Sequence, residues 1–145
     1  FGNKMKKICF DIDGVICKTK KNLYNKSVPI KKSIKIINSL YKQKFKILIF
    51  TARYMGRNSD NIVKAKKEGY RLTKKQLKKW GVKYHKLIFG KPSFDLMIDD
   101  KSLNFNSNWR SWNNDLVFVD DGFNWKVVWD ERSYHSPGFT GCFLA

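Results

Sequence analysis

The stretch Lys7-Ile-Cys-Phe-Asp-Ile-Asp-Gly14 places two carboxylates directly after a short apolar run. Residues 7–12 are rich in strand-forming side chains, and Gly14 is a turn signal. An apolar run without alternation is typical of a strand buried on both faces, as in a parallel sheet. The stretch therefore predicts a buried strand that delivers Asp11 and Asp13 to its carboxyl end.

Strand-like and helix-like segments alternate along the rest of the chain. Further strands are predicted at 45–50, 87–89, 94–98, 116–119 and 126–129. Helices are predicted at 29–42, at 60–68 before Gly69, and at 73–80, which opens on the capping-box pattern Thr73-Lys-Lys-Gln76. This alternation predicts an α/β fold, a Rossmann-like three-layer sandwich around a mostly parallel sheet.

The length and composition fit one globular domain. The 145 residues are 42% hydrophobic, and no apolar run approaches the roughly 20 residues of a membrane span. We expect the domain to cover residues 5–130, followed by an irregular tail over 131–145. Residues 1–4 are interpreted as a cloning remnant ahead of a natural start at Met5.

The cysteines and the chain start indicate a cytoplasmic protein. Cys9, Cys17 and Cys142 are odd in number and form no Cys-x-x-Cys pair, which argues against disulfides and a structural zinc site. Cys9, within the apolar run, is expected to be a buried free thiol. The N-terminus lacks the pattern of a secretory signal.

Polar side chains follow several predicted strands at the point where each ends. Asp11 and Asp13 follow the first, Thr51 ends the second, Lys91 follows the third, and Asp99-Asp100 follow the fourth. Because the carboxyl ends of parallel strands meet at one edge of a sheet, we expect these side chains to lie close together.

The residue types at this edge suit phosphate chemistry. Close carboxylates such as Asp11 and Asp13 repel each other unless a cation lies near, and an oxygen-rich cluster favours Mg²⁺. Lys91 and Thr51 offer a positive charge and a neutral donor for phosphate oxygens. Phosphoryl transfer depends mainly on positioning and charge neutralisation, which this set can supply.

Four segments together resemble the motifs of the haloacid dehalogenase-like superfamily. They are residues 8–15 around Asp11 and Asp13, Phe50-Thr-Ala-Arg53, Lys91-Pro92 and Ile98-Asp-Asp100. Their order and spacing agree over about residues 5–105. Asp-x-Asp-Gly alone also occurs in calcium loops, so the specificity comes from the four segments in order.

The resemblance implies a role for each residue. Asp11 attacks phosphorus and becomes an aspartyl-phosphate, while Asp13 protonates the leaving alcohol and later activates water. Thr51, Ala52 and Lys91 hold the phosphoryl oxygens. Magnesium is bound by Asp11, Asp13 through its backbone carbonyl, and Asp99, with Asp100 as a further ligand. The second aspartate, Asp13, favours phosphate-ester hydrolysis.

The spacing between the motifs leaves no room for a cap domain, so the resemblance implies an open site, or one closed by another subunit of a homo-oligomer or by the C-terminal segment. The local sequence around residues 50–57 is similar to small phosphatases of capsule and lipopolysaccharide biosynthesis, which implies a sugar phosphate or related metabolite as substrate. Arg53 and Arg57 could reach a second anionic group of that substrate.

Two alternatives remain open. The phosphatase domain of polynucleotide kinase shares the capless plan, which suggests a 3′-phosphatase acting on nucleic-acid ends. A binding protein that kept the fold without activity is the other. The net charge of +18 is compatible with nucleic acid, but only five of the 30 basic residues are arginine, and that lysine excess also fits AT-rich codon usage.

Overall fold

The computed structural model describes residues 6–102 and the backbone of residues 116–120, 125–129 and 143–144. The chain divides into two units, Phe1–Asp95 and Leu96–Ala145. Their positions relative to one another are not determined, so each unit is described by itself.

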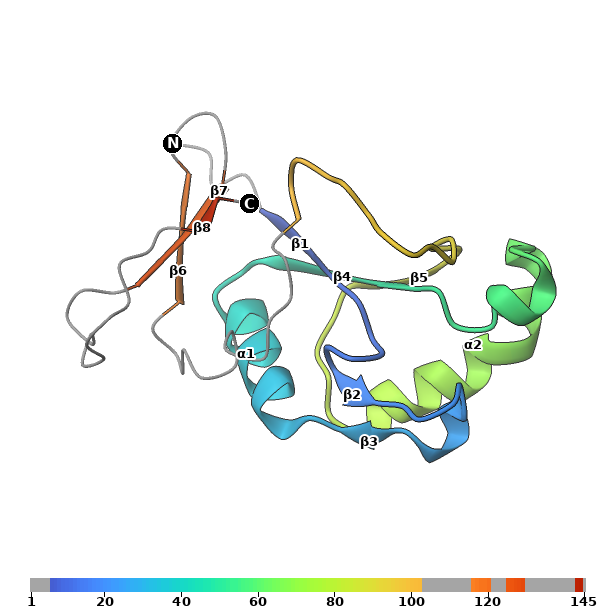
Figure 1. Ribbon diagram of the computed structural model, residues 1–145. Coiled ribbons are helices and arrows are strands. Elements are labelled where there is room, and N and C mark those ends of the chain that lie inside the picture. Colours follow the sequence, from blue (N-terminus) through green and yellow to red (C-terminus); the bar gives the residue numbers. More distant parts are fainter. Residues whose placement is uncertain (1–5, 103–115, 121–124, 130–142, 145) are drawn as a thin grey trace. The chain divides into compact units, whose positions relative to one another are not determined.

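The first unit is built on a three-stranded parallel sheet (Figure 1). Its strands are β1 (Lys7–Phe10), β4 (Lys46–Thr51) and β5 (Lys86–Phe89), in the order β1-β4-β5. The parallel register pairs β1 with β4 and β4 with β5. The predicted α/β class is therefore confirmed, and the architecture agrees with a Rossmann-like fold.

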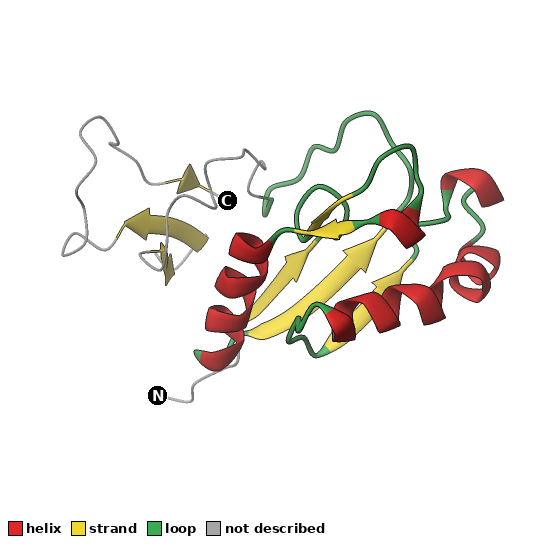
Figure 2. Cartoon of the chain, turned by 90° about the horizontal axis from the view of Figure 1, so that it is seen from below, coloured by secondary structure: helices red, strands yellow, loops and turns green. Residues whose placement is uncertain are grey.

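Two helices, α1 (Lys31–Lys42) and α2 (Ile62–Lys79), cover one face of this sheet (Figure 2). Each connects two neighbouring parallel strands, and two right-handed crossovers in the same direction place both helices on the same side. Ile47 and Ile49 of β4 are fully buried, as is Ile37 of α1. The alternate β4 side chains, including Leu48, are half-buried on the other face.

A small hairpin follows β1 along the chain. It pairs β2 (Cys17–Lys18) with β3 (Val28–Pro29), and the one-turn helix η1 (Tyr24–Lys26) lies in its connection. Most of the segment between β1 and α1 is irregular. A second one-turn helix, η2 (Gly56–Asn58), interrupts the loop between β4 and α2.

The prediction of two helices separated at Gly69 was wrong, because α2 is continuous from Ile62 to Lys79. Gly69 is buried where the ring of Tyr54 crosses the helix, and a Cβ at position 69 would clash with that ring. Gly69 therefore does not end a helix. Its lack of a side chain leaves room for the ring of Tyr54.

The predicted strand at 94–98 was also wrong. Residues 94–98 form no strand, and Leu96 and Ile98 are exposed. A strand needs a hydrogen-bonding neighbour, and none of the described strands pairs with this segment.

The second unit contains an antiparallel sheet of β6 (Leu116–Asp120), β7 (Trp125–Trp129) and β8 (Phe143–Leu144). The last two predicted strands therefore exist, and they pair with each other in antiparallel fashion. Most of the predicted tail over 131–145 lies outside the described residues, although β8 falls within it. Cys142 and the proposed remnant at residues 1–4 also lie outside them.

Cys9 was expected to be buried but is exposed, whereas Cys17 is buried, and both are free thiols. In the described part of the sheet, Cys9 belongs to an edge strand, which has a neighbour on one side only. None of the described helices has the length and apolar character needed to cross a membrane.

The contact between Gly69 and Tyr54 predicts the effect of a methyl group. The Tyr54 ring packs against the ring of Tyr24, at 4.7 Å between centroids, and against the Arg57 guanidinium, at 4.8 Å. Gly69→Ala should therefore lower the free energy of unfolding by about 1–2 kcal/mol in urea denaturation, despite the better helix propensity of alanine.

In a Tyr54→Ala background the same substitution should instead stabilise the protein, by about 1 kcal/mol. Gly56→Ala is the matched control, since nothing lies within 4 Å of its added Cβ. Stabilisation by Gly69→Ala in the wild-type background would contradict the steric explanation.

Candidate functional site

The carboxyl edge of the parallel sheet gathers Asp11, Thr51 and Lys91. The backbone N–H of Lys91 donates to the carbonyl of Thr51 at 3.2 Å, which ties the segment after β5 to the end of β4. The Lys91 Nζ atom then lies 3.3 Å from Asp11 Oδ2. The structure thus brings together the polar groups that follow three different strands, as their positions in the sequence predict.

A tight loop shapes the region after Asp11. The carbonyl of Ile12 accepts backbone hydrogen bonds from Val15, Ile16 and Cys17, and the N–H of Gly14 donates to the carbonyl of Cys17 at 2.8 Å. Gly14 has φ +87°, a left-handed conformation that residues with a side chain rarely adopt. The loop turns the chain sharply, so that Asp11 and Asp13 enter different surroundings.

Asp11 is partly shielded from water and is paired with one cation. Its Oδ1 accepts from the N–H of Ile12 at 2.8 Å, while Oδ2 faces Lys91. Burial raises the pKa of the Asp11 carboxyl, and the charge of Lys91 offsets part of that rise. The carboxylate is therefore incompletely neutralised in the chain alone.

Asp13 is held by a buried arginine. Arg53, which is 1% exposed, donates from Nε to Asp13 Oδ2 at 2.9 Å and from Nη2 to Oδ1 at 2.9 Å. This two-pronged geometry fixes the plane of the carboxylate as well as its position. Burial lowers the pKa of the Arg53 guanidinium, but the hydrogen bonds and charge of Asp13 raise it by more.

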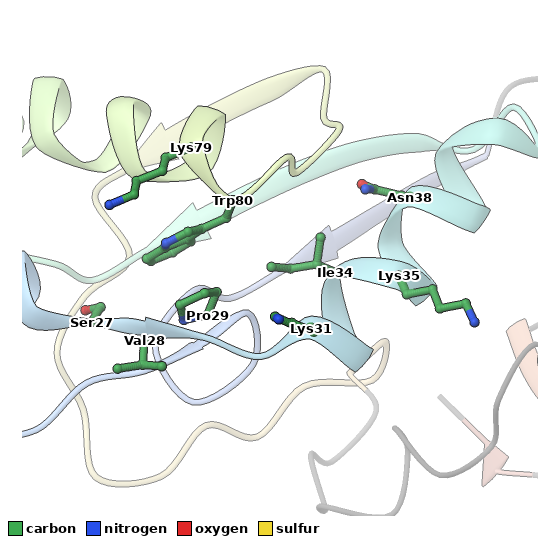
Figure 3. Close-up of a pocket in the computed structure, with 9 residues that line it drawn as sticks. All are labelled: Ser27, Val28, Pro29, Lys31, Ile34, Lys35, Asn38, Lys79 and Trp80. Carbon is green, nitrogen blue, oxygen red and sulfur yellow. The ribbon is translucent and has the colours of Figure 1, made fainter.

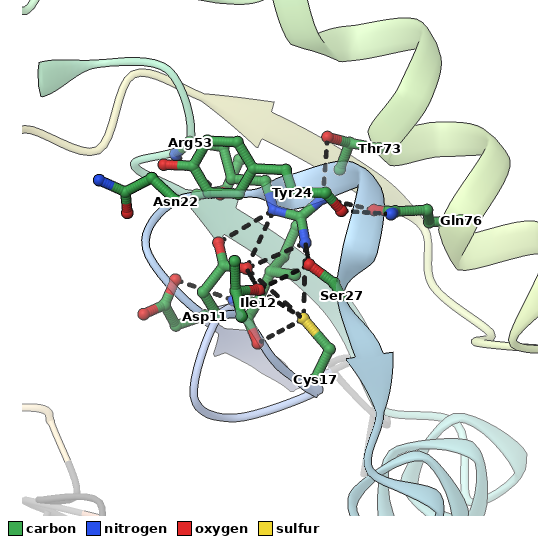
Figure 4. A network of polar contacts seen from close by, with 12 residues as sticks. Asp11, Ile12, Cys17, Asn22, Tyr24, Ser27, Arg53, Thr73 and Gln76 are labelled. Carbon is green, nitrogen blue, oxygen red and sulfur yellow. Dashed lines mark hydrogen bonds and ion pairs between the residues drawn. The ribbon is translucent and has the colours of Figure 1, made fainter. Parts of the chain in front are cut away.

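The remaining donors of Arg53 bind side chains from distant parts of the chain (Figure 4). Nη1 donates to Gln76 Oε1 at 2.6 Å and to Thr73 Oγ1 at 3.3 Å. Nη2 also donates to Ser27 Oγ at 3.2 Å and to Cys17 Sγ at 3.4 Å. Arg53 thereby joins the hairpin and α2 to the loop that carries Asp13.

The two oxygens of Asp13 differ in their hydrogen bonding. Oδ1 accepts from Arg53, from Thr19 Oγ1 at 2.5 Å and from Cys17 Sγ at 3.5 Å. Among the described residues, Oδ2 has only Arg53 Nε as a donor. Oδ2 is therefore the less engaged oxygen, while Oδ1 anchors the group.

The position of Cys17 beside this carboxylate affects its own chemistry. Burial raises the pKa of the Cys17 thiol, and the charge of Asp13 raises it further. The thiol is thus kept in its protonated form, which donates to Asp13 rather than repelling it. Cys17 contributes a hydrogen bond to the site and lacks the low pKa of a reactive cysteine.

Arg57 has a different environment from Arg53. It is about half exposed, and its guanidinium donates to Glu68 at 3.2 Å and to the carbonyl of Asn22 at 3.1 Å. It also lies over the rings of Tyr24 and Tyr54. The predicted contact of Arg57 with substrate stays a prediction. The guanidinium of Arg53 is buried and donates to acceptors within the protein, which leaves it less able to contact a substrate.

Sequence reasoning missed most of the network around Arg53. Thr73 and Gln76 were interpreted as a capping box, but they lie inside α2 and bind the same guanidinium nitrogen. A capping box and a pair of polar residues facing a buried cation share a three-residue spacing, so the pattern alone does not separate them. Thr19 and Ser27 gave no signal in the sequence.

The predicted phosphate ligands after β4 are well shielded. Thr51 is fully buried, and its hydroxyl accepts from the N–H of Arg53 at 3.1 Å. Ala52 is half-buried and packs against the cluster of Tyr54 and Met55. Thr51 thus helps to fix the first residues after the strand. Its hydroxyl acts as an acceptor in this hydrogen bond, so the hydroxyl group can still donate one to a ligand.

Asp99 and Asp100 belong to the second unit, so their position relative to Asp11 and Asp13 is not determined. Both are exposed. The backbone N–H of Lys101 donates to Asp99 Oδ1 at 3.1 Å and lowers the pKa of that carboxyl. In the described part of the chain, no group of three or more His, Cys, Asp or Glu side chains is placed to hold a metal ion.

Comparisons with known proteins support the fold. No protein-family model matches the chain, and no curated protein does. The chain is similar to the crystal structure of an MCSG target from Vibrio cholerae, with a TM-score of 0.64 and 24% sequence identity. The likeness covers 76% of this chain and 97% of the Vibrio chain. At this identity the likeness shows the α/β fold alone.

The environments of Arg53 and Arg57 predict unequal effects of the same substitution. Arg53→Lys keeps the charge but removes the two-pronged contact and several buried hydrogen bonds, so urea denaturation should show a loss of about 2–4 kcal/mol. Arg57→Lys, at an exposed ion pair, should cost less than about 1 kcal/mol. Equal losses for the two variants would show that the Asp13 contact has no special weight.

Proposed function

We propose that the chain is a magnesium-dependent phosphohydrolase of the haloacid dehalogenase-like superfamily. In this proposal it hydrolyses a phosphate monoester in the cytoplasm through an aspartyl-phosphate on Asp11. The observation that carries the proposal is the separate pairing of the two carboxylates: Asp11 with Lys91, and Asp13 with Arg53.

This separation suits a nucleophile and a proton-transfer group. Asp11 faces Lys91, whose ammonium can attract a phosphoryl group and screen its charge as the carboxylate approaches. Asp13 is held rigidly at Oδ1 and is less engaged at Oδ2, as a group that exchanges protons with the substrate requires. Partial burial of Asp11 also limits the access of water, which would weaken these electrostatic interactions.

In the first proposed step, an Asp11 oxygen attacks phosphorus. The bond from phosphorus to the ester oxygen breaks, and the leaving alcohol takes a proton from the carboxyl group of Asp13. In the second step, Asp13 accepts a proton from water as that water attacks phosphorus. The bond from phosphorus to Asp11 breaks, which releases inorganic phosphate and restores the Asp11 carboxylate.

Magnesium fits the oxygen donors of the first unit in part. The hydrogen bonds of the loop after Asp11 end on the carbonyls of Ile12 and Cys17, which leaves the Asp13 carbonyl to other partners. We propose that this carbonyl and the Asp11 carboxylate bind Mg²⁺ with Asp99, and that Asp100 supports them. The ion would neutralise charge on the phosphoryl oxygens. Thr51, Ala52 and Lys91 would hold the phosphoryl group itself.

The proposed architecture is a capless three-layer sandwich, with an open site or one completed by another copy of the chain. We propose a sugar phosphate or related metabolite as substrate, on the similarity around residues 50–57, with Arg57 as a substrate contact. A nucleic-acid 3′-end is the second candidate, favoured by the basic charge of the first unit. Comparing sugar phosphates with a 3′-phosphorylated oligonucleotide at several salt concentrations separates the two.

Removal of the nucleophile provides the first test of the proposed function. Asp11→Asn should lower the kcat for p-nitrophenyl phosphate at least about 1,000-fold, and EDTA should abolish turnover by the wild type until Mg²⁺ is restored. Rapid acid quench with a ³²P-labelled ester should trap a phosphorylated protein in the wild type alone. Absence of turnover on a broad panel of phosphate esters would leave the inactive binding protein as the surviving alternative.

The leaving group provides a test of Asp13 and Arg53. A poor leaving group needs protonation, so Arg53→Lys should reduce the kcat for an alkyl phosphate about 10-fold more than for p-nitrophenyl phosphate. Asp13→Asn should show the same selectivity more strongly. Arg57→Lys is the control and should affect both esters alike. If Arg53→Lys also slowed both esters equally, Arg53 would be a structural residue only.

A further inference from the structure

The basic residues are concentrated in the first unit. All but four of the chain's 30 basic residues fall before Leu96, the four being Lys101, Arg110, Lys126 and Arg132. Only five of its 12 acidic residues do, namely Asp11, Asp13, Asp60, Glu68 and Asp95. The positive net charge therefore comes from the unit that carries the parallel sheet. A lysine excess spread evenly over the chain, as codon usage would produce, does not explain this uneven distribution.

Much of this charge lies on the two helices that cover the sheet. The basic residues of α1 are Lys31, Lys32, Lys35 and Lys42, with no acidic residue among them. Those of α2 are Lys64, Lys66, Lys67, Arg71, Lys74, Lys75, Lys78 and Lys79. The single acidic residue of α2, Glu68, already accepts hydrogen bonds from Arg57 and Asn58.

Four cations form a row along α2. Lys67, Arg71, Lys75 and Lys79 follow one another at four-residue intervals, and all are exposed. Side chains at this spacing are neighbours on a helix, about 6 Å apart along its axis, and like charges there destabilise it. An extended anion lying along such a row would relieve this repulsion.

The row ends at a groove between the helices (Figure 3). The groove has a volume of about 670 Å³, and Lys31, Ile34 and Lys35 of α1 line the side opposite Trp80, with the Lys35 side chain directed away from the indole in this view. Val28, which is 61% exposed, adds apolar surface. No acidic residue is among the described residues that line the groove. It thus combines an indole and aliphatic groups with three lysines in its lining.

The groove has a fixed shape because one side chain joins its walls. Asn38 of α1 donates from Nδ2 to the carbonyl of Gly81 at 2.8 Å and accepts at Oδ1 from the N–H of Lys83 at 2.8 Å. Both bonds fasten α1 to the turn that follows α2. Trp80 and Lys79, immediately before that turn, are thereby held opposite Lys31 and Lys35.

We propose that this groove and the adjoining row of cations bind single-stranded nucleic acid. An aromatic ring beside a track of cations is the arrangement that holds unpaired bases by stacking and their phosphates by charge. A duplex offers no free base face to Trp80, and one phosphorylated metabolite would engage few of the cations. A flat anionic membrane would not enter a groove.

The groove also borders the proposed catalytic site. Ser27 lines the groove, and its hydroxyl accepts from Arg53 Nη2 at 3.2 Å. Arg53 in turn holds Asp13. A bound strand would therefore lie against the same hairpin that supports the proton-transfer group. The binding proposal nevertheless stands by itself, because it requires no turnover.

Fluorescence anisotropy tests the proposal with the full chain in EDTA, so that no hydrolysis enters. The probes are fluorescein-labelled single-stranded 15-mers of DNA and of RNA, a matched duplex, and vesicles containing phosphatidylserine. Trp80→Leu should weaken single-strand binding at least about 5-fold, and Trp80→Phe, which keeps an aromatic face, should restore most of it. Circular dichroism checks that each variant is folded.

Charge variants supply the matched control. Lys35→Gln/Lys79→Gln removes two cations from the groove and should reduce the slope of log K against log salt by about 1.4, at about 0.7 for each phosphate that is no longer neutralised. Lys7→Gln/Lys86→Gln removes the same charge from exposed positions of β1 and β5 and should leave the slope nearly unchanged.

Several results would overturn the proposal. They are absence of binding at 50 mM salt, equal losses from the two lysine pairs, tighter binding of the duplex, or vesicle binding that depends on Trp80 to the same degree. Binding without hydrolysis of 3′-phosphorylated ends would leave the groove in place and reject nucleic acid as the phosphatase substrate. Hydrolysis of sugar phosphates without strand binding would reject the groove proposal and leave the proposed phosphatase function in place.

Discussion

The contact on which the first unit depends is the buried pair of Arg53 and Asp13. A guanidinium that is 1% exposed is tolerated only if its charge and donors are satisfied within the protein. The pair achieves this with groups from the loop after β1, the hairpin and α2. Each of these elements contributes a hydrogen bond to the same cation, and removal of that cation would leave a partly shielded carboxylate without its partner.

The same contact separates the chemistry of two neighbouring aspartates. Close carboxylates repel, and the sequence suggested that a metal ion must relieve that repulsion. The structure supplies two side-chain cations instead: Lys91 faces Asp11, and Arg53 faces Asp13. A magnesium ion therefore has a narrower task in the proposed reaction, which is to neutralise the phosphoryl oxygens. One aspartate keeps an incompletely compensated charge, and the other is held in a fixed orientation.

The carboxyl edge of the sheet and the helical layer of the first unit carry their charges in different ways. The carboxyl edge of the sheet collects single charged groups in a shielded setting, where each charge has a partner. The helical layer presents many cations to water, with one acidic residue in α2 that is already engaged. Ser27 touches both regions. A strand bound along the helices would thus meet the hairpin that also supports Asp13, which relates the surface charge to the proposed catalytic edge.

The sequence by itself determined the class of fold and the edge at which Asp11, Thr51 and Lys91 meet. Apolar runs specify parallel strands, and the polar residues that follow them share one edge, although β1 has no buried residue where burial on both faces was predicted. Only the tertiary structure decided the roles of Gly69, Thr73 and Gln76. In the sequence Gly69 looks like a helix stop and the Thr73–Gln76 pair looks like a cap, but Gly69 makes room for Tyr54 and the pair binds Arg53. It also decided that residues 94–98 form no strand, since a strand depends on a neighbour that local pattern does not specify. The partners of Arg53 lie 20 to 40 positions away in the chain, and a contact at that separation leaves no periodic signal in one sequence.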